Sequence, residues 1–233
     1  MKIQKDKVSV IMSVFNAEKT LSDCIQSILY QTYSNFEFLI VDDSSTDGTY
    51  DLLESFQLKD NRIRIFQNDI NIGLTKSLNL VSSFATGEYL ARQDADDISL
   101  VTRFERQIKV MTNKNIDSCN TRAITRNSHL ITPSKSYYLP FWISMKYKNP
   151  FIHGSLMIRR TVFEEINRYD ENFYYAQDYK LMDSLINNNY SPFILKEPLY
   201  ILNQTNNIST NNKEEQKYYA RCVTSNQTPN TRK

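Results

Sequence analysis

Five aspartates follow two short apolar segments of this chain, and their spacing suits the binding of a divalent cation. They are Asp42, Asp43, Asp94, Asp96 and Asp97. Like charges this close together raise one another's pKa unless a cation neutralises them. Oxygen ligands favour Mg²⁺ or Mn²⁺, and magnesium usually takes its remaining ligands from water and substrate phosphates. The pattern therefore predicts a metal site that binds a nucleotide diphosphate.

A D-x-D sequence is also common in solvated loops and at helix starts, so this alternative has to be weighed. Asp97 could cap a helix that starts near Ser99, and Asp43 could belong to an Asx turn. Ligands of open α/β sheets, however, bind outside the carboxyl ends of the strands. Because both groups of aspartates end strands of one predicted sheet, a functional site is the preferred interpretation.

Alternating strand and helix patterns position these aspartates. Strands are predicted at 8–14, 36–43, 62–66 and 87–93, and helices near 21–29, 50–56, 74–85 and 101–111. Asn16 and Ser45 are the predicted N-caps of the first two helices. Strand–helix units at this spacing imply an α/β fold, with a parallel sheet and helices on its faces.

Past residue 115 the regular alternation of strand and helix patterns ends. The sequence predicts strands at 116–124 and 151–158, a helix at 178–186, and two short closing strands at 191–195 and 199–202. From residue 203 onward the chain is polar and poor in apolar residues, which predicts a flexible tail over 203–233 with one helix near 214–222.

Composition excludes several function classes. The four glycines, at 48, 73, 87 and 154, cannot form a G-x-G-x-x-G dinucleotide loop or a G-x-x-x-x-G-K-[ST] phosphate loop. A net charge of +2 without a long basic run argues against nucleic acid as a partner. Three widely spaced cysteines favour a reduced, cytoplasmic protein. The apolar runs are too short for a signal peptide or a membrane span, so we expect at most peripheral association with the inner face of the cytoplasmic membrane.

Four blocks of sequence follow one another in the first half of the chain: VSVIMSVFNAEKTLSDCIQSILYQTYSNFEFLIVDDSSTDGT, NIGLTKSLN, ATGEYLARQDADD and RFERQ. In order and spacing they resemble family 2 glycosyltransferases of the GT-A fold. The resemblance continues more loosely through NPFIHGSLMIRR and AQDYKLMDSL to about residue 202. It implies one Rossmann-like GT-A domain over 1–202, with a mostly parallel central sheet flanked by helices. Residues 8–112 would be its nucleotide-sugar-binding half and 113–202 its acceptor-binding half.

The resemblance implies a nucleotide-binding region in the first half. Ser13, Phe15 and Glu18 match a P-x-Y-N-x-E block that lines the nucleotide, with serine in place of proline and phenylalanine in place of tyrosine. Phe15 can still stack on a base but lacks the phenolic hydroxyl. Glu18 is also expected in the first turn of a helix, where the helix dipole alone would favour an acidic side chain. Asp42 matches the carboxylate that contacts the base, and Lys76 a basic position near the pyrophosphate, although a solvated helix lysine is the simpler alternative.

The same resemblance assigns the metal and its surroundings. Asp94, Ala95 and Asp96 match the D-x-D motif, with Asp96 as the main ligand of Mn²⁺ or Mg²⁺ and Asp94 as a ligand of the metal or the ribose. Ala95 belongs to the nucleotide-sugar site. Arg92 is expected to orient these carboxylates through an ion pair.

The catalytic base implied by the resemblance is Asp178. It would accept the proton of the acceptor hydroxyl as that hydroxyl attacks the anomeric carbon. Gln177 stands before it where the family often has glutamate. His153 is a candidate contact to acceptor, phosphate or metal, against the alternative of a structural histidine.

These assignments predict a metal-dependent, inverting glycosyltransferase. It would transfer one sugar from a nucleotide-sugar donor, expected to be UDP-linked, to a hydroxyl of a surface glycan or a lipid-linked oligosaccharide. Single addition is expected because Trp142 is the only tryptophan and no Q-x-x-R-W motif occurs. The alternative is a catalytically inactive sugar-nucleotide-binding partner. A nucleotidyltransferase would need a glycine-rich loop after the first strand, and a haloacid-type phosphatase would carry its D-x-D there.

Overall fold

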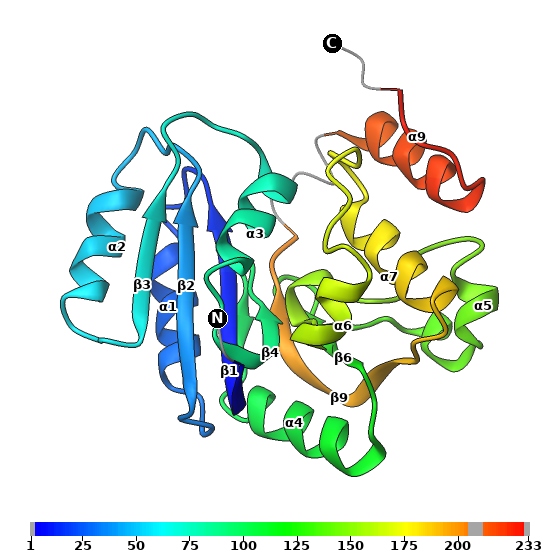
Figure 1. The fold of residues 1–233 in the computed structure, drawn as a ribbon, viewed down its shortest axis with the longest axis horizontal. Coiled ribbons are helices and arrows are strands. Elements are labelled where there is room, and N and C mark those ends of the chain that lie inside the picture. Colours follow the sequence, from blue (N-terminus) through cyan, green and yellow to red (C-terminus); the bar gives the residue numbers. More distant parts are fainter. Residues whose placement is uncertain (1–2, 205–211, 231–233) are drawn as a thin grey trace.

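The computed structural model describes residues 3–204 and 212–230, which are built around one strongly curved sheet (Figure 1). Within this part of the chain the elements are β1 (Gln4–Val14), α1 (Leu21–Leu29), β2 (Phe36–Asp42), α2 (Thr49–Gln57), β3 (Ile63–Gln67), α3 (Leu74–Ser82), β4 (Gly87–Arg92), β5 (Ile98–Ser99), α4 (Arg103–Lys114), β6 (Ser118–Thr125), β7 (Ile131–Thr132), α5 (Phe141–Ser144), β8 (Met157–Arg159), α6 (Arg160–Glu165), α7 (Gln177–Asn187), β9 (Pro192–Leu202) and α9 (Lys213–Thr224). Two 3₁₀ turns, η1 (Lys135–Tyr138) and η2 (His153–Ser155), complete them.

The first half of the sheet is parallel, as the sequence predicts. The strands lie in the order β3-β2-β1-β4, and every neighbouring pair among them is parallel. All seven residues of β2 are buried, which explains why its sequence is almost continuously apolar. Each strand is followed by a helix that returns the chain to the amino end of the sheet, so the loops carrying the aspartates gather at the carboxyl end.

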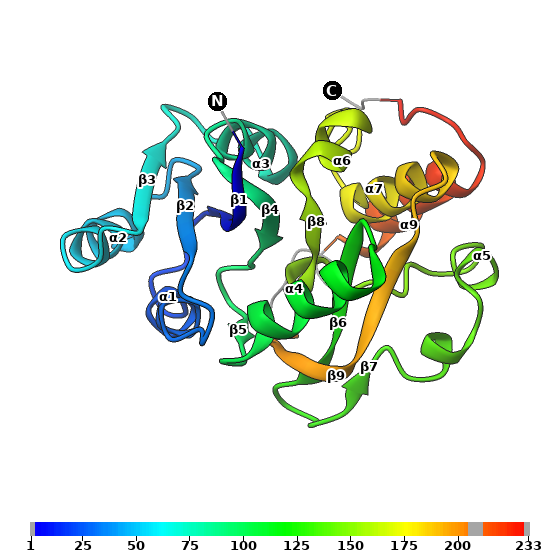
Figure 2. The same ribbon diagram turned by 60° about the horizontal axis from the view of Figure 1, so that its bottom comes forward.

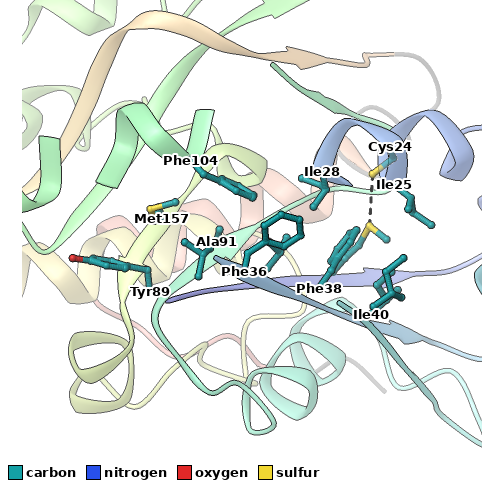
Figure 3. Packing of buried hydrophobic residues seen from close by; sticks show 14 of the residues in the cluster. Cys24, Ile25, Ile28, Phe36, Phe38, Ile40, Tyr89, Ala91, Phe104 and Met157 are labelled. Atoms are coloured by element: carbon teal, nitrogen blue, oxygen red, sulfur yellow. Dashed lines mark hydrogen bonds between the residues drawn. The ribbon is translucent and has the colours of Figure 1, made fainter. Parts of the chain in front are cut away.

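Helices cover both faces of this sheet. On one face, α1, α2 and α4 pack against alternate residues of β1 and β2. Figure 3 shows this cluster, where Ile25 and Ile28 of α1 lie over Phe36 and Phe38 of β2. On the other face, α3, α6 and α7 pack against the remaining alternate residues. This two-sided burial fixes the register of the strands and hence the positions of their ends.

The second half of the sheet is mixed. β8 runs antiparallel to β4 and to β6, whereas β6 and β9 are parallel. The expectation of two short closing strands is wrong, because 192–202 form one strand that stays paired with β6 through an irregularity around Arg122. Of the strand expected at 151–158, only Met157 and Ile158 belong to a strand, β8, and 153–155 form η2.

The predicted N-caps of the first two helices are also wrong. α1 begins at Leu21 after Thr20, and α2 begins at Thr49 after Gly48. Asn16 instead accepts a hydrogen bond at Oδ1 from the amide of Thr46, at 2.8 Å. The loops after β1 and β2 are therefore longer than the sequence suggests, and they are tied to each other.

Residues 213–224, within the stretch expected as a flexible tail, form α9, which confirms the helix predicted near 214–222. Its buried residues Tyr219, Cys222 and Val223 cluster with Phe173 and Tyr179, next to and within α7. Figure 1 shows α9 lying over the carboxyl-edge loops beside α7. In the described ranges, 3–204 and 212–230, every helix is too short or too polar to cross a bilayer.

Candidate active site

Three adjacent strands bring the first group of candidate residues to one edge of the sheet. Val14 of β1 lies opposite Asp42 of β2, and Ile11 of β1 lies opposite Arg92 at the end of β4. Ser13, half-buried near the end of β1, therefore lies between Asp42 and the loop that carries Asp94. Parallel order alone produces this convergence, as predicted from the sequence.

Asp42 is a buried carboxylate held in place from the loop that follows it. Its Oδ1 accepts hydrogen bonds from the amide of Ser45 at 3.2 Å and from the hydroxyl of Ser45 at 2.5 Å. Gln67 at the end of β3 donates to Oδ2 at 3.2 Å. These contacts fix the carboxylate at the strand end.

Asp43 has a different role. Its Oδ1 accepts hydrogen bonds from the side chain of Asn68 and the amide of Ile72, and its Oδ2 accepts one from the amide of Gly73, all within 2.9 Å. Gly73 has a φ of +87°, which a residue with a side chain rarely adopts. Asp43 thus anchors the turn that starts α3, and its oxygens are already used.

The remaining aspartates form the tight loop after β4. Arg92, whose side chain is buried, makes the predicted ion pair with Asp94, with 2.6 Å between Nη2 and Oδ1. Burial and the neighbouring charge of Asp94 raise the pKa of Asp96 to about 6. Burial and the charges of Asp94 and Asp96 raise the pKa of Asp97 to about 9. A bound cation would relieve this accumulation of negative charge.

Asp97 does not cap a helix, and its carboxylate has a structural contact in place of a proposed cation. Its Oδ1 accepts a hydrogen bond from the amide of Asn203 at 2.6 Å, so it ties the loop after β4 to the end of β9. Asp94 and Asp96 are left as the candidate cation ligands. No group of three His, Cys, Asp or Glu suited to a metal occurs in the described part of the chain. Two carboxylates nevertheless fit Mg²⁺ or Mn²⁺ when substrate phosphates complete the shell.

A buried polar frame, not recognised from the sequence, shapes this loop. Gln93 donates from Nε2 to the carbonyls of Asp94 and Asp97, each at 3.0 Å. Arg103 donates to Oε1 of Gln93 at 3.0 Å and to the carbonyls of Arg92 at 2.8 Å and Gly154 at 3.2 Å. Burial lowers the pKa of Arg103 to about 10, which still leaves it protonated at neutral pH. Arg103 is the first residue of the RFERQ block, but the sequence alone predicts no role for it.

Gly154 brings the second half of the chain against Asp94. A Cβ at this position would lie 2.5 Å from Asp94 Oδ2, and it would also overlap the hydroxyl of Tyr200. The same hydroxyl accepts a hydrogen bond from the amide of Asp94 at 3.2 Å. Only glycine allows η2 to approach the carboxylate this closely.

His153, next to that glycine, is hydrogen-bonded to Tyr169, with 2.8 Å between Nε2 and Oη. Burial lowers the pKa of His153, and the positive charge of Arg92 lowers it further, while Asp94 and Asp178 oppose the shift. The imidazole is therefore neutral at physiological pH. This geometry accounts for a structural histidine, and it leaves the predicted contact with acceptor, phosphate or metal as a proposal.

Asp178 lies in the first turn of α7, half-buried, and its Oδ2 accepts a hydrogen bond from the side chain of Asn149 at 2.8 Å. Its charge acts on the pKa of both His153 and Tyr169, as does that of Asp94. The candidate base and the D-x-D loop thus both lie near one buried His–Tyr pair, although 84 residues separate Asp94 and Asp178 in the sequence.

The other predicted residues lie around this centre. Phe15, just after β1, is 49% exposed. Lys76 is exposed on α3, and Ala95 is half-buried in the loop after β4. Glu18 precedes α1 and accepts a hydrogen bond from the amide of Gly48 at 3.2 Å. Glu18 therefore interacts with the start of α2 and not with the first turn of α1.

Comparison with known proteins consistently finds similarity to glycosyltransferases. The family model "Glycosyl transferase family 2" matches residues 9–167. EpsE of Bacillus subtilis (strain 168) is 36% identical over 166 residues, which are 70% of this chain and 60% of EpsE. The Escherichia coli UDP-Glc:alpha-D-GlcNAc-diphosphoundecaprenol beta-1,3-glucosyltransferase WfgD is 34% identical over 188 residues, which are 78% of this chain and 70% of WfgD. The chain thus spans less than two thirds of the length of the first of these relatives.

Solved structures share the fold. S. aureus TarS 1-349 in complex with UDP-GlcNAc superposes with a TM-score of 0.78 at 20% identity, over 93% of this chain and 65% of that one. The mannosyltransferase PcManGT from Pyrobaculum calidifontis, in complex with GDP-Man and Mn2+, gives a TM-score of 0.74 at 16% identity, over 95% of this chain and 65% of that one. The predicted α/β fold of the GT-A type, with a mostly parallel sheet between helices, is confirmed.

Proposed function

The chain belongs to glycosyl transferase family 2, and from this premise we propose that it is a metal-dependent, inverting enzyme that transfers one sugar from a UDP-linked donor to an acceptor hydroxyl. The observation that carries the proposal is that Asp94 and Asp178 converge on the buried His153–Tyr169 pair: Gly154, next to His153, lies against Asp94, and the charges of Asp94 and Asp178 both act on His153. This arrangement gives one carboxylate for the donor side and one for the acceptor side of a single reaction centre.

The donor would lie along the carboxyl ends of β1, β2 and β4. We propose that Phe15 stacks on the base, that Asp42 accepts a hydrogen bond from it, and that Ser13 and Ala95 line the nucleotide. Asp96, with Asp94, would hold Mn²⁺ or Mg²⁺, which when bound supplies positive charge to the departing diphosphate. Glu18, Lys76 and Arg92 remain proposed members of this site. WfgD, whose name specifies UDP-Glc, supports a UDP-linked donor.

On the acceptor side, Asp178 is the proposed base. Asn149 occupies its Oδ2, which leaves Oδ1 to accept the proton of the acceptor hydroxyl. As the acceptor oxygen bonds to the anomeric carbon, the bond from that carbon to the phosphate oxygen breaks and the nucleoside diphosphate leaves. A single displacement of this kind inverts the anomeric centre. The acceptor class we propose is a surface glycan or lipid-linked oligosaccharide, which the name of WfgD supports.

The proposal is tested by measuring nucleotide release from a panel of nucleotide sugars with candidate acceptors, with and without Mn²⁺. We expect metal-dependent release with a UDP-sugar, and loss of at least a hundredfold of it in Asp96→Asn. Asp51→Asn, which changes an exposed carboxylate of α2, is the matched control and should keep full activity. Donor binding without turnover by any acceptor would instead support an inactive binding partner.

Asp178→Asn separates the base from the donor site. We expect kcat to fall by roughly a hundredfold to ten-thousandfold while the KM for the donor changes little. Retention of wild-type kcat would show that another group is the base. NMR of the product anomeric configuration tests inversion, and product length tests single addition.

A further inference from the structure

Residues 130–148, which include β7, η1 and α5, expose an unusual amount of apolar surface. Among the described residues, fourteen large apolar or aromatic side chains are exposed, and six of them lie in this segment. They are Leu130, Ile131, Tyr138, Leu139, Trp142 and Tyr147. Tyr147 is 84% exposed and Tyr138 is 73% exposed. Such a concentration on one segment indicates a surface that binds something.

The exposed side chains do not result from a loose segment. The opposite side of the same segment is packed, because the rings of Phe141 and Phe151 lie 5.0 Å apart and Met145 contacts the core beside α7. The hydroxyl of Tyr179 donates a hydrogen bond to the carbonyl of Met145. The segment thus has an anchored face and an outward face, and Trp142 and Lys146 lie together on the outward face, 5.7 Å apart.

The charged side chains of this stretch of sequence are all of one sign. No aspartate or glutamate occurs between Asp117 and Glu164, a stretch that contains seven lysines and arginines. Lys135, Lys146 and Lys148 are exposed within the segment itself. The whole chain is nearly balanced, with a net charge of +2, so this is a local accumulation.

We propose that the outward face of residues 130–148 docks on a bilayer that contains anionic phospholipid. Tryptophan and tyrosine are the side chains that favour the boundary between hydrocarbon and headgroups, and lysines beside them are attracted to anionic headgroups. A protein partner would not require the complete absence of acidic residues. The inference stands on this surface and does not depend on the transfer reaction.

The segment 130–148 ends beside a residue that contacts the candidate base. α5 lies at the edge of the molecule opposite α2 in both views (Figures 1 and 2). Asn149, directly after the segment, holds the candidate base Asp178. A lipid-anchored acceptor could therefore reach Asp178 without the protein leaving the surface.

The test uses Trp142, the single tryptophan of the chain, as a fluorescent probe within the proposed surface. The full chain is mixed with vesicles of phosphatidylcholine, with and without phosphatidylglycerol. We expect a blue shift of the emission and co-sedimentation only with the anionic vesicles, and weakening of both at high salt. Binding that is equal on neutral and anionic vesicles, or absent from both, would overturn the proposal.

Two surface variants and one control make the result specific. The variants are Lys135→Glu/Lys146→Glu/Lys148→Glu and Tyr138→Ser/Trp142→Ser/Tyr147→Ser, and the control is Tyr30→Ser/Leu58→Ser/Lys59→Glu, at exposed positions directly after α1 and α2. Each lysine is worth about fivefold in vesicle affinity, so the first variant should lose at least roughly a hundredfold, and the control should bind as the wild type does. Unchanged melting temperatures verify folding.

Two further outcomes are informative. If the wild type self-associates without lipid and the surface variants are monomeric, the face is a protein interface and the lipid proposal is wrong. Release of nucleotide with a water-soluble acceptor should be the same in wild type and surface variants. Loss of vesicle binding with this activity retained separates the present proposal from the proposed function.

Discussion

Asp94 is the residue whose position depends on the largest number of separate parts of the chain. The ion pair with Arg92 holds the carboxylate of Asp94, and Gly154 lies against its Oδ2. The backbone amide of Asp94 donates a hydrogen bond to the hydroxyl of Tyr200. Each contact comes from a different element, and each constrains the same residue. A small displacement of a group that positions a substrate costs about a hundredfold in rate.

Gly154→Ala is expected to damage catalysis more than stability. The added Cβ would lie 2.5 Å from Asp94 Oδ2, so the carboxylate must move and kcat/KM should fall by about a hundredfold. Gly87→Ala is the matched control, because its Cβ would lie 2.5 Å from the carbonyl oxygen of Lys7 at the opposite end of β4. That variant should melt at a lower temperature and keep the kcat of its folded fraction. Equal loss of kcat in both would contradict this account of Asp94.

Glu37 shows how a buried carboxylate away from the site stabilises the sheet. Burial by itself would raise its pKa, but hydrogen bonds from Ser9 and Thr86 and the charge of Lys7 outweigh burial, so the pKa is lowered from 4.5. The hydroxyl of Ser9 donates to it at 2.6 Å, and Lys7 Nζ lies 3.4 Å away. The folded state thus binds the proton less readily than the unfolded state does.

Glu37→Gln should make the unfolding free energy less dependent on acid pH. The wild-type carboxylate stabilises the fold fully above pH 4.5, and this contribution is lost as the pH falls through the lowered pKa. We expect the variant to be less stable by roughly 1–3 kcal/mol at neutral pH, with a smaller difference at about pH 3. Urea unfolding at both pH values measures this, with Glu54→Gln on the exposed side of α2 as control. A constant difference at both pH values would show that the charge of Glu37 is not the cause.

At the scale of elements, the junction between β4 and α4 determines the shape of the D-x-D loop. Arg103, the first residue of α4, places its guanidinium under the loop and donates to the carbonyls at the end of β4 and in η2. Gln93 connects the two ends of the loop from within. The loop is therefore held by buried hydrogen bonds, and its aspartates are presented at its surface.

Helix α9 packs on the loop that leads into α7, on the side of the site that carries Asp178. Tyr219 lies between the rings of Phe173 and Tyr175, with centroids 6.1 Å and 5.6 Å away. Phe173 and Tyr175 belong to the loop that leads into α7 and Asp178. Packing of α9 on this loop should therefore stabilise the start of the helix that carries the candidate base.

Tyr219→Ala tests this role. Removal of the ring should lower the unfolding free energy by roughly 2–4 kcal/mol and increase hydrogen exchange at the start of α7. Lys217→Ala, whose side chain is 66% exposed, should change stability by less than about 0.5 kcal/mol. Unchanged exchange in α7 upon loss of Tyr219 would mean that α9 and α7 open independently.

At the scale of the whole molecule, one sheet joins two halves that are built differently. The parallel half carries Asp42 and Asp94 at its carboxyl edge, and the antiparallel pair β4–β8 connects it to the half that carries Asp178 and Tyr200. Two apolar clusters on opposite faces of the sheet both extend across this junction. The site therefore lies where the halves meet, over a continuous core.

The three free cysteines report on the cooperativity of that core. Cys24 and Cys119 are fully buried, and burial raises the pKa of both thiols, that of Cys119 to about 12. Cys222 lies in α9, at the periphery. We expect a thiol reagent to label Cys222 first, by local opening of α9, and the other two only at the rate of global unfolding.

Mass spectrometry after timed labelling measures this order, and Cys222→Ser should remove the fast phase. In denaturant all three thiols should react together. Labelling of Cys24 as fast as Cys222 under native conditions would show that the face covered by α1 opens without unfolding of the sheet.

The sequence by itself determined the parallel half of the fold and the identity of the main candidate residues. Continuous apolar runs such as that of β2 can only be buried on both faces, and helical periodicity between them requires a parallel sheet. That order places Asp42 and Asp94 at one edge whatever the details of the loops. The chemistry of the D-x-D motif and of Asp178 was therefore available from residue types, spacing and the family resemblance.

Only the tertiary structure decided which of these groups are free and what holds them. Asp43 and Asp97 have the same chemistry as Asp94 in the sequence, but backbone amides from distant segments occupy them. The roles of Gln93, Arg103, Tyr200 and Asn149 also depend on contacts between distant segments. Hydrogen-bond partners far apart in the chain leave no periodic signal, because they are set by how the two halves of the sheet pack together.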